Sequence, residues 1–493
     1  MKMHKVSTIT KAFFLAGILT GCSMTPDYTP PEMTMSEAYT QIEGVNGSQT
    51  LSSDQAWWKG FYDPILNQLV ADAQQQNIPL RIASERIKMA QSYHEMVSSF
   101  KVPTVSLGAG YVNYQISEND PLLGAAVSPI GVPAAAQPLV GSSVTLMDQQ
   151  QDGFGVGATI AWEMDLFGRI DSQADAAEIR KEQVEIYRSG LNTLVTADVI
   201  SNYLQYRGAI ERKAIAMGTI EDQKSTLKLV KKVVDNGYGS ELDISQASAM
   251  LAATEAIIPQ LDIAANIHKQ RLAILLGQRT SSLDLGEENP EQVTPELTGI
   301  IPLGLPSDLL QRRPDVRMAE REIAAMNEEL GAAIASRYPK LFLTGTPGLV
   351  AGDFDDLFNS DSFGWMASAG VSWTVFDGGR GEAMVDIQEA RLETSVLTYQ
   401  HAVNGAFAEV ETLLFAYGNS QKYQASITQA QQQTETALSK ANALYNAGLI
   451  DYLSVLDAQR QHNMMKDRVV AAKLQTAQSV VGLHKALGGE WEI

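Results

Sequence analysis

The stretches IAWEMDLFGRI (160–170) and VSWTVFDGGRG (371–381) decide the fold, because they show that one pattern occurs twice in the chain. In both, large apolar residues alternate with small or polar ones before a closing Gly–Arg pair. One spacing, 211 positions, separates three pairs: Trp162 and Trp373, Gly168 and Gly379, and Arg169 and Arg380. A recurring pattern at a constant offset predicts a tandem duplication.

The duplication extends over most of the chain. The same offset of 211 aligns 236–248 with 447–459 and 272–277 with 483–488. Upstream the offset is 236, as LRIASERI (80–87) and VRMAEREI (316–323) show, so the first copy holds 25 additional residues between Pro103 and Trp162. Residues 117–143 are rich in Gly, Pro, Ala and Ser, and we predict a long loop there.

Each copy contains two alternating segments, near 104–114 and 154–165 in the first and near 340–350 and 365–376 in the second. One face of each is apolar and the other small or polar, which is typical of strands that cross a membrane between lipid and a polar lumen. Tilted strands of ~9–11 residues span a bilayer. Strands of a soluble β-sandwich are the alternative.

Four strands are too few to close a barrel, for which about eight are needed. An open sheet edge in lipid leaves backbone N–H and C=O groups without partners. The strands must therefore pair between chains, and either two or three copies would satisfy this requirement.

Long helices are predicted to follow the strands, because residues 169–236 lack proline and keep apolar residues at steps of three and four, and 380–447 is the equivalent segment of the second repeat. Such a helix would extend about 100 Å. Four shorter helices are predicted at 72–101, 243–276, 308–337 and 454–487. Two short helices laid end to end match one long helix, so we expect antiparallel helices of equal height.

The repeated phrases mark the junctions between strand and helix. They contain Trp162, Gly168 and Arg169 in the first copy and Trp373, Asp377, Gly378, Gly379 and Arg380 in the second. Asp377 is suited to cap the helix, and the glycines permit a sharp change of backbone direction. The tryptophans are expected near the membrane interface. Pro103 and Pro339 mark the reverse junction, from helix into strand.

The N-terminus has the pattern of an export signal, residues 1–21, with three lysines before the apolar run AFFLAGIL (12–19). LTGC (19–22) resembles a bacterial lipobox, which implies cleavage before Cys22 and acylation of its sulfur. Cys22 is the single cysteine of the chain, and several acyl chains give firm anchoring. Ser23 follows the cysteine, rather than the aspartate that resembles an inner-membrane retention signal, and this favours the outer membrane. The alternative is an ordinary signal peptide with a chance cysteine.

Composition and motifs argue against several other functions. The net charge of −20 disfavours nucleic acid as a partner. The six histidines lack metal-ligand spacing, and we find no catalytic constellation. We therefore expect no enzyme, no metal site and no cofactor beyond acyl chains on Cys22.

Nearly the whole chain resembles the TolC-like outer membrane efflux proteins, in particular the acylated subgroup that works beside resistance-nodulation-division pumps. The motifs that carry the resemblance are LTGC (19–22), AWWKGFYDPILNQLV (56–70), residues 305–341 including LLQRRPDVRMAE, VSWTVFDGGR (371–380) and YNAGLIDYLSVLDAQR (445–460). The resemblance implies a mixed α and β membrane protein, a homotrimer with a 12-strand outer-membrane barrel continued by a long periplasmic helical barrel. It also implies a periplasmic adaptor and an inner-membrane pump as partners.

On this basis the chain divides into six parts. They are the signal peptide 1–21, a lipid-anchored segment 22–65, repeat 1 at 66–280, an equatorial linker at 281–306, repeat 2 at 307–488 and a tail at 489–493.

The implied function is a passive exit duct for drugs and small toxic compounds that opens at its periplasmic helical tip. A duct for type I protein secretion or metal-cation efflux is the alternative. A purely structural coiled-coil envelope protein is the competing class.

The turns at 236–243 and 447–454 are the predicted gate. Asp457 matches a constricting aspartate of the family, and Asp243 matches one that pairs with an arginine. That arginine position is Ile450 here, and Ser454 replaces a second ring aspartate. Arg460 lies one helical turn from Asp457, where we expect it to restrain the carboxylate. A solvated coiled-coil carboxylate is the alternative for Asp457, and an N-cap is the favoured interpretation of Asp243.

Overall fold

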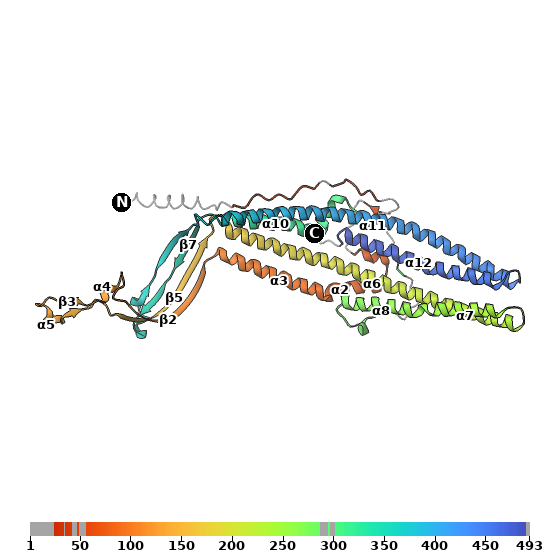
Figure 1. The fold of residues 1–493 in the computed structure, drawn as a ribbon, viewed down its shortest axis with the longest axis horizontal. Coiled ribbons are helices and arrows are strands. Elements are labelled where there is room, and N and C mark those ends of the chain that lie inside the picture. Colours follow the sequence, from red (N-terminus) through yellow and green to blue (C-terminus); the bar gives the residue numbers. More distant parts are fainter. Residues whose placement is uncertain are drawn as a thin grey trace. The chain divides into compact units, whose positions relative to one another are not determined.

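The computed structural model describes residues 24–33, 35–41, 47–48, 56–285, 294–295 and 301–489. The predicted signal peptide and Cys22 lie outside these residues. The chain forms two compact units (Figure 1). The first comprises the residues up to Tyr28, Ser92–Glu178 and Ala325–Leu392; the second comprises Thr29–Gln91, Ile179–Ala324 and the chain from Glu393 onward.

A twisted antiparallel sheet forms the centre of the first unit. Its longer strands are β2 (Thr104–Gln115), β5 (Gln150–Met164), β7 (Lys340–Gly345) and β10 (Ala367–Ser372), and they pair in the order β2–β5–β7–β10. The shorter β8 (Gly348–Ala351) and β9 (Phe363–Gly364) continue the sheet beside β5. Among the described residues β2 pairs only with β5 and β10 only with β7, so the sheet has two free edges.

The strands of the second repeat are less continuous than predicted. The segment 340–350 is divided into β7 and β8, and within 365–376 only β10 forms, while β9 lies just before that segment. Pro347 lies at the first break, and proline has no N–H to donate to a ladder. The prediction that the strand continues to 376 is wrong, because the ladder stops where Ser372 pairs with Lys340.

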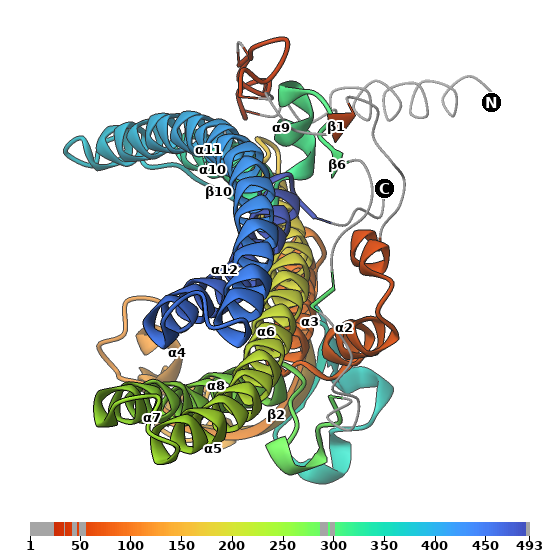
Figure 2. The ribbon, with the colours of Figure 1, turned by 90° about the vertical axis from the view of Figure 1, so that its right-hand side faces the viewer.

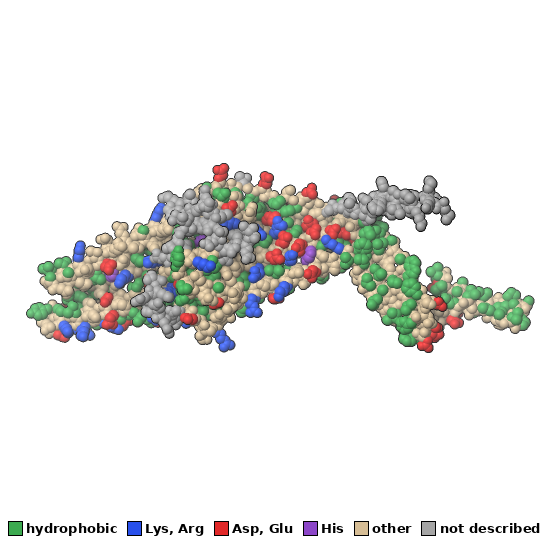
Figure 3. Space-filling view, turned by 180° about the vertical axis from the view of Figure 1, so that it is seen from behind, with side chains coloured by type: hydrophobic (Ala, Val, Ile, Leu, Met, Phe, Trp, Pro, Cys, Tyr) green, Lys and Arg blue, Asp and Glu red, His purple; other side chains and the backbone are tan. Residues whose placement is uncertain are grey.

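The residues between β2 and β5, predicted as a loop, contain short elements. They are α4 (Gly124–Val127), α5 (Gln137–Val140) and a small hairpin of β3 (Ile130–Gly131) and β4 (Ser143–Val144). The region is densely apolar: Leu122 and Leu139 are almost fully exposed. Figure 3 shows hydrophobic side chains covering much of the strand region.

The long helices match their predictions within one residue. They are α6 (Arg169–Asp235) and α11 (Arg380–Asn446), each of 67 residues. The shorter helices are α2 (Pro64–Gln76), α3 (Ile78–Ser98), α7 (Glu241–Glu255), α8 (Ile257–Leu275), α9 (Leu309–Arg312), α10 (Pro314–Ala335) and α12 (Tyr452–Ala486). The helix predicted to start at 72 begins earlier, because Asp63 caps α2 by accepting from Ile65 and Leu66.

Short helices meet end to end, as predicted, and equivalent residues of the two repeats form the hydrogen bonds between the helix ends. The Asn77 Nδ2 atom donates to the carbonyl of Leu275 at 2.7 Å, which joins the α2–α3 corner to the end of α8. In the second repeat the Arg313 guanidinium donates to the carbonyl of Ala486 at 2.8 Å, which joins α10 to the end of α12. The offsets are again 236 for the donors and 211 for the acceptors.

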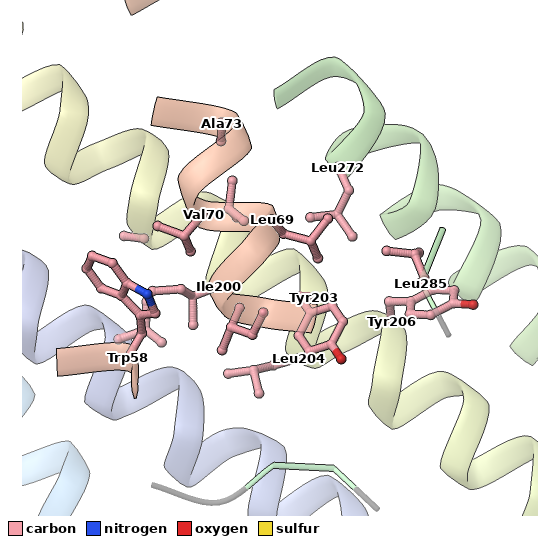
Figure 4. Packing of buried hydrophobic residues seen from close by; sticks show 14 of the residues in the cluster. Trp58, Leu69, Val70, Ala73, Ile200, Tyr203, Leu204, Tyr206, Leu272 and Leu285 are labelled. Carbon is pink, nitrogen blue, oxygen red and sulfur yellow. The ribbon is translucent and has the colours of Figure 1, made fainter. Parts of the chain in front are cut away.

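The largest hydrophobic core lies in the second unit, where α2 packs on α6 and α8 (Figure 4). Leu66, Val70, Ile200, Tyr203 and Leu272 are completely buried there. The Tyr203 hydroxyl donates to Asp63 at 2.7 Å, which satisfies the one polar atom of that buried side chain.

Helices α6 and α12 lie side by side (Figure 2). Ser201 donates to Gln478 at 2.6 Å, and Arg212 forms an ion pair with Asp467. A Cβ at Gly208 would overlap the side chain of Leu474, so this glycine allows the two helices to approach closely.

The N-terminal segment docks on the helices at two places. In the first unit the Thr25 hydroxyl lies 2.7 Å from that of Ser172. In the second unit Glu411 accepts from the backbone and the hydroxyl of Thr40 and from the backbone of Gln41. Tyr39 enters the core beside Phe407.

No helix among the described residues is both long enough and apolar enough to cross a membrane.

Candidate functional site

The candidate site is formed by the two turns that join α6 to α7 and α11 to α12. Gly237 and Gly448 take positive φ of 84° and 72°, and each ends its long helix with the same pair of backbone hydrogen bonds. The N–H of Tyr238 reaches the carbonyl of Val233, and that of Leu449 reaches Leu444, as in a Schellman motif. Glycine is required because other residues rarely take this conformation.

Serine and aspartate exchange their capping roles between the two helices that leave the turns. In the first turn Ser240 is the N-cap and Asp243, three residues later, accepts from the Ser240 backbone at 2.9 Å. In the second turn Asp451 is the N-cap and accepts from the backbone and the hydroxyl of Ser454. The prediction of Asp243 as the N-cap is therefore wrong in position, because the cap is Ser240 and Asp243 reciprocates within the capping box.

An apolar cluster behind the turns joins all four helices. Val230, Ala247, Tyr452 and Val455 are buried, and the partly buried Ile450 packs against them. Ile450 occupies the position where the family resemblance implies an arginine. The contact between the two hairpins in this chain is thus apolar at that position.

Two tyrosines connect this cluster to the first turn. The rings of Tyr445 and Tyr452 lie 5.8 Å apart. Burial, then Tyr445 and the Asp243 carboxylate, together raise the pKa of Tyr452 to about 12. Burial and then Asp243 also raise the pKa of Tyr445. Both phenols are therefore protonated at neutral pH. Sequence reasoning missed them, although YNAGLIDY places one on each side of the turn.

Asp457 lies on α12 beyond the turn and is restrained as predicted. Its carboxylate accepts from Arg460 at 2.6 Å and from Gln461 at 2.7 Å. The side chains of Asp457 and Arg460 are 50% and 74% exposed, so the ion pair adds little stability by itself. The four predicted gate residues do not form one cluster: Asp243 and Ser454 belong to separate caps, and Asp457 and Arg460 form a third group.

The junctions between strands and helices repeat the same hydrogen bond. The indole N–H of Trp162 donates to the carbonyl of Lys101 at 3.1 Å, and that of Trp373 donates to Arg337 at 3.0 Å. Each tryptophan thus ties the end of a strand to the end of the helix that precedes the sheet. Pro103 and Pro339 each lie one residue before a strand.

The predicted cap at Asp377 is confirmed, because its carboxylate accepts from the backbones of Gly379, Arg380 and Gly381. Those bonds lower its pKa. Gly168, Gly378 and Gly379 all have positive φ, as the predicted change of direction requires.

The first repeat uses a different capping residue. Asp165 accepts from the backbones of Arg169, Ile170 and Asp171. Arg169 also binds Glu163 at 2.8 Å. Sequence comparison of the repeats missed Asp165, because the offset of 211 aligns it with Phe376 rather than Asp377.

These features together define a class of protein. A sheet with four longer strands and two free edges, whose strands lead into 67-residue helices that end in paired turns, is the subunit design of an outer-membrane efflux channel.

The chain belongs to the outer membrane efflux protein family, whose model matches residues 69–278 and 305–489. It is 30% identical to the solvent efflux pump outer membrane protein SrpC of Pseudomonas putida over 97% of both chains. It is 26% identical to the cation efflux system protein CusC of Escherichia coli O157:H7 over 97% of this chain and 98% of CusC. Its fold matches the outer-membrane channel OprN with a TM-score of 0.83 at 30% identity, covering 95% of this chain and 100% of OprN. The protein is thus an outer-membrane efflux channel, a transport channel rather than an enzyme.

Proposed function

We propose that three copies of the chain form the exit duct of a tripartite efflux system. The observation that carries this is the pair of free sheet edges at β2 and β10. Edges in lipid cannot be satisfied by water, so β10 of one copy pairs with β2 of the next. Three copies supply twelve strands, above the minimum of about eight for a barrel.

The duct conducts passively, and a periplasmic adaptor and an inner-membrane pump supply the substrate and the energy. Drugs and small toxic compounds are the proposed cargo. The name of SrpC, a solvent efflux pump protein, supports this cargo. CusC, named for cation efflux, supports metal cations as the second candidate.

The N-terminus anchors the duct to the outer membrane after removal of residues 1–21 and acylation of Cys22. The contacts of the residues that follow Cys22 in the sequence support this proposal. Asn327 donates to the carbonyl of Pro26 at 2.8 Å, and Thr25 contacts Ser172 and Glu328. The segment 22–65 then reaches the linker 281–306, as the parallel pairing of Gly47 with Ile301 supports.

The periplasmic opening lies at the paired turns. The apolar cluster around Tyr452 holds the two hairpins of one subunit together. In a trimer Asp457 would occur three times around one axis, and a ring of carboxylates favours cations and repels anions. Arg460 and Gln461 fix the direction of each carboxylate.

Growth of a deletion strain tests the function. A strain that lacks the gene is compared with one that carries it on a plasmid, on toluene, on amphiphilic drugs and on copper or silver salts. We expect the deletion to lower tolerance to solvents and drugs and the plasmid to restore it. Loss of metal tolerance alone would favour the cation duct, and unchanged tolerance to every compound would contradict an efflux role.

A further inference from the structure

The two helical turns expose matching apolar pairs. Tyr238 is 87% exposed and Leu242 59%, and their equivalents at the offset of 211, Leu449 and Leu453, are 71% and 45% exposed. Large apolar side chains at a tip, rimmed by polar ones, mark a protein contact surface. The two turns thus expose large apolar side chains at equivalent positions.

Charge distinguishes the turns. The last three turns of α6 carry Lys228, Lys231 and Lys232, all exposed. Their equivalents on α11 are Ser439, Asn442 and Ala443, and the one lysine nearby, Lys440, takes the position of Leu229. Lysine and arginine side chains lie near this end of the helices in Figure 3. The duplicated chain has thus placed a basic face on one of two otherwise equivalent hairpins.

The three lysines make no ion pair within the described chain, although Asp235 follows them within a turn. Cations further from the turn are paired: Arg212 with Asp467, Lys213 with Asp262 and Lys224 with Glu255. Lys228 lies three and four residues before Lys231 and Lys232, and like charges at these helical spacings repel one another at some cost. A negative partner would remove that cost.

We propose that the tip of the first hairpin is a charge-selective docking surface for a partner protein. The partner presents an apolar surface flanked by acidic side chains that meet Lys228, Lys231 and Lys232. The second hairpin accepts the same partner by apolar contact alone. The proposal rests on the proposed function, in which the tip meets a periplasmic adaptor, and it adds that the two contacts of each subunit differ in chemistry.

The test uses the full-length trimer in nanodiscs and two synthetic helical hairpins. Both probes carry leucines at the turn, and one flank bears either three glutamates or three lysines. We expect the acidic probe to bind about tenfold more tightly than the basic probe at low salt, and the difference to shrink above ~0.5 M salt, where charges are screened.

The variant K228S/K231N/K232A carries the residues of the second hairpin and should abolish the preference for the acidic probe. The reciprocal variant S439K/N442K/A443K should add a second tight site per subunit, which titration calorimetry reads as a doubled stoichiometry. Both use residues that already fold as helix at the equivalent position.

Equal binding of the two probes, or an unchanged preference in K228S/K231N/K232A, would overturn the proposal. So would dissociation of the trimer in that variant, because the lysines would then serve sister subunits. Growth on solvents separates this result from the proposed function: a duct that restores tolerance yet ignores probe charge leaves the efflux role intact.

Discussion

Asp457 near the turns and His484 in the core make contacts of different kinds. Asp457 is half exposed, and its contacts with Arg460 and Gln461 orient it rather than stabilise the fold. His484 is buried and lies flat against Trp57, with ring centroids 4.1 Å apart. The first residue is therefore expected to affect conductance, and the second stability.

Asp457→Ala is expected to raise the conductance of the closed channel and to weaken its block by multivalent cations, because the carboxylate ring would be lost. Single-channel recording in planar bilayers measures both. Asp262→Ala is the matched control, since that aspartate is 51% exposed and pairs with Lys213 away from the turns. If the two variants behave alike, Asp457 has no part in the gate.

His484 is expected to make stability depend on pH. Burial, and then Arg312, lower its pKa from 6.5 to about 3. The folded protein thus keeps His484 neutral while the unfolded chain binds a proton below pH 6.5. Stability is lost as pH falls from 6.5 toward 3, by about 2 kcal/mol at pH 5.

Replacing His484 by Phe keeps a flat ring against Trp57 and removes the titrating group. Denaturant titrations in detergent at pH 8 and pH 5 measure the effect as the difference between parent and variant. The parent should lose more stability than His484→Phe across this interval. Parallel losses would show that His484 titrates alike in both states.

At the scale of elements, glycines decide which segments can approach the helices. Gly331 in α10 faces Thr25, and a Cβ there would lie 2.7 Å from the Thr25 Cα atom. Gly405 in α11 has nothing within 4 Å of an added Cβ. Both glycines lie inside helices, but only an added Cβ at Gly331 would meet a neighbouring segment.

Gly331→Ala is expected to displace the segment that carries Thr25 and Pro26, and Gly405→Ala to leave it in place. Alanine in an open helix interior stabilises by about 0.5–1 kcal/mol relative to glycine, so the control should gain slightly. Limited proteolysis followed by N-terminal sequencing detects release of the segment. If the segment resists the protease equally in both variants, the contact described between Thr25 and Gly331 is contradicted.

Elements also show how far sequence alone can predict this fold. The bounds of α6 and α11 follow from the absence of proline and from the glycines beyond each end, which are local signals. The division of β7 from β8 was missed, although Pro347 was visible. The cap at Asp165 was missed because the repeats use different residues for the same bond.

At the scale of the whole molecule, assembly depends on the free edges of the sheet. Val105 near the start of β2 and Val371 near the end of β10 are both exposed, and each lies close to a junction with a helix. In a closed ring of subunits these two edges meet. The chain contains one natural cysteine, so few crosslinks other than those between introduced cysteines can form.

The double variant V105C/V371C, treated with a bis-maleimide whose spacer is about 10 Å long, is expected to give covalent trimers in denaturing gels, because each subunit offers both reactive edges. Either single variant should stay monomeric under the same treatment. Covalent dimers without trimers would indicate a ring of two, and monomers alone would contradict pairing between β2 and β10.

The sequence by itself determined the duplication, the positions of the long helices, the junction residues and the need for partner strands. These follow from periodicity and from backbone chemistry, which act within a few residues. Only the tertiary structure decided that Asn77 meets Leu275, that Arg313 meets Ala486 and that Tyr452 enters an apolar cluster. Such contacts join residues far apart in the chain, and packing between helices sets their register, which local patterns do not encode.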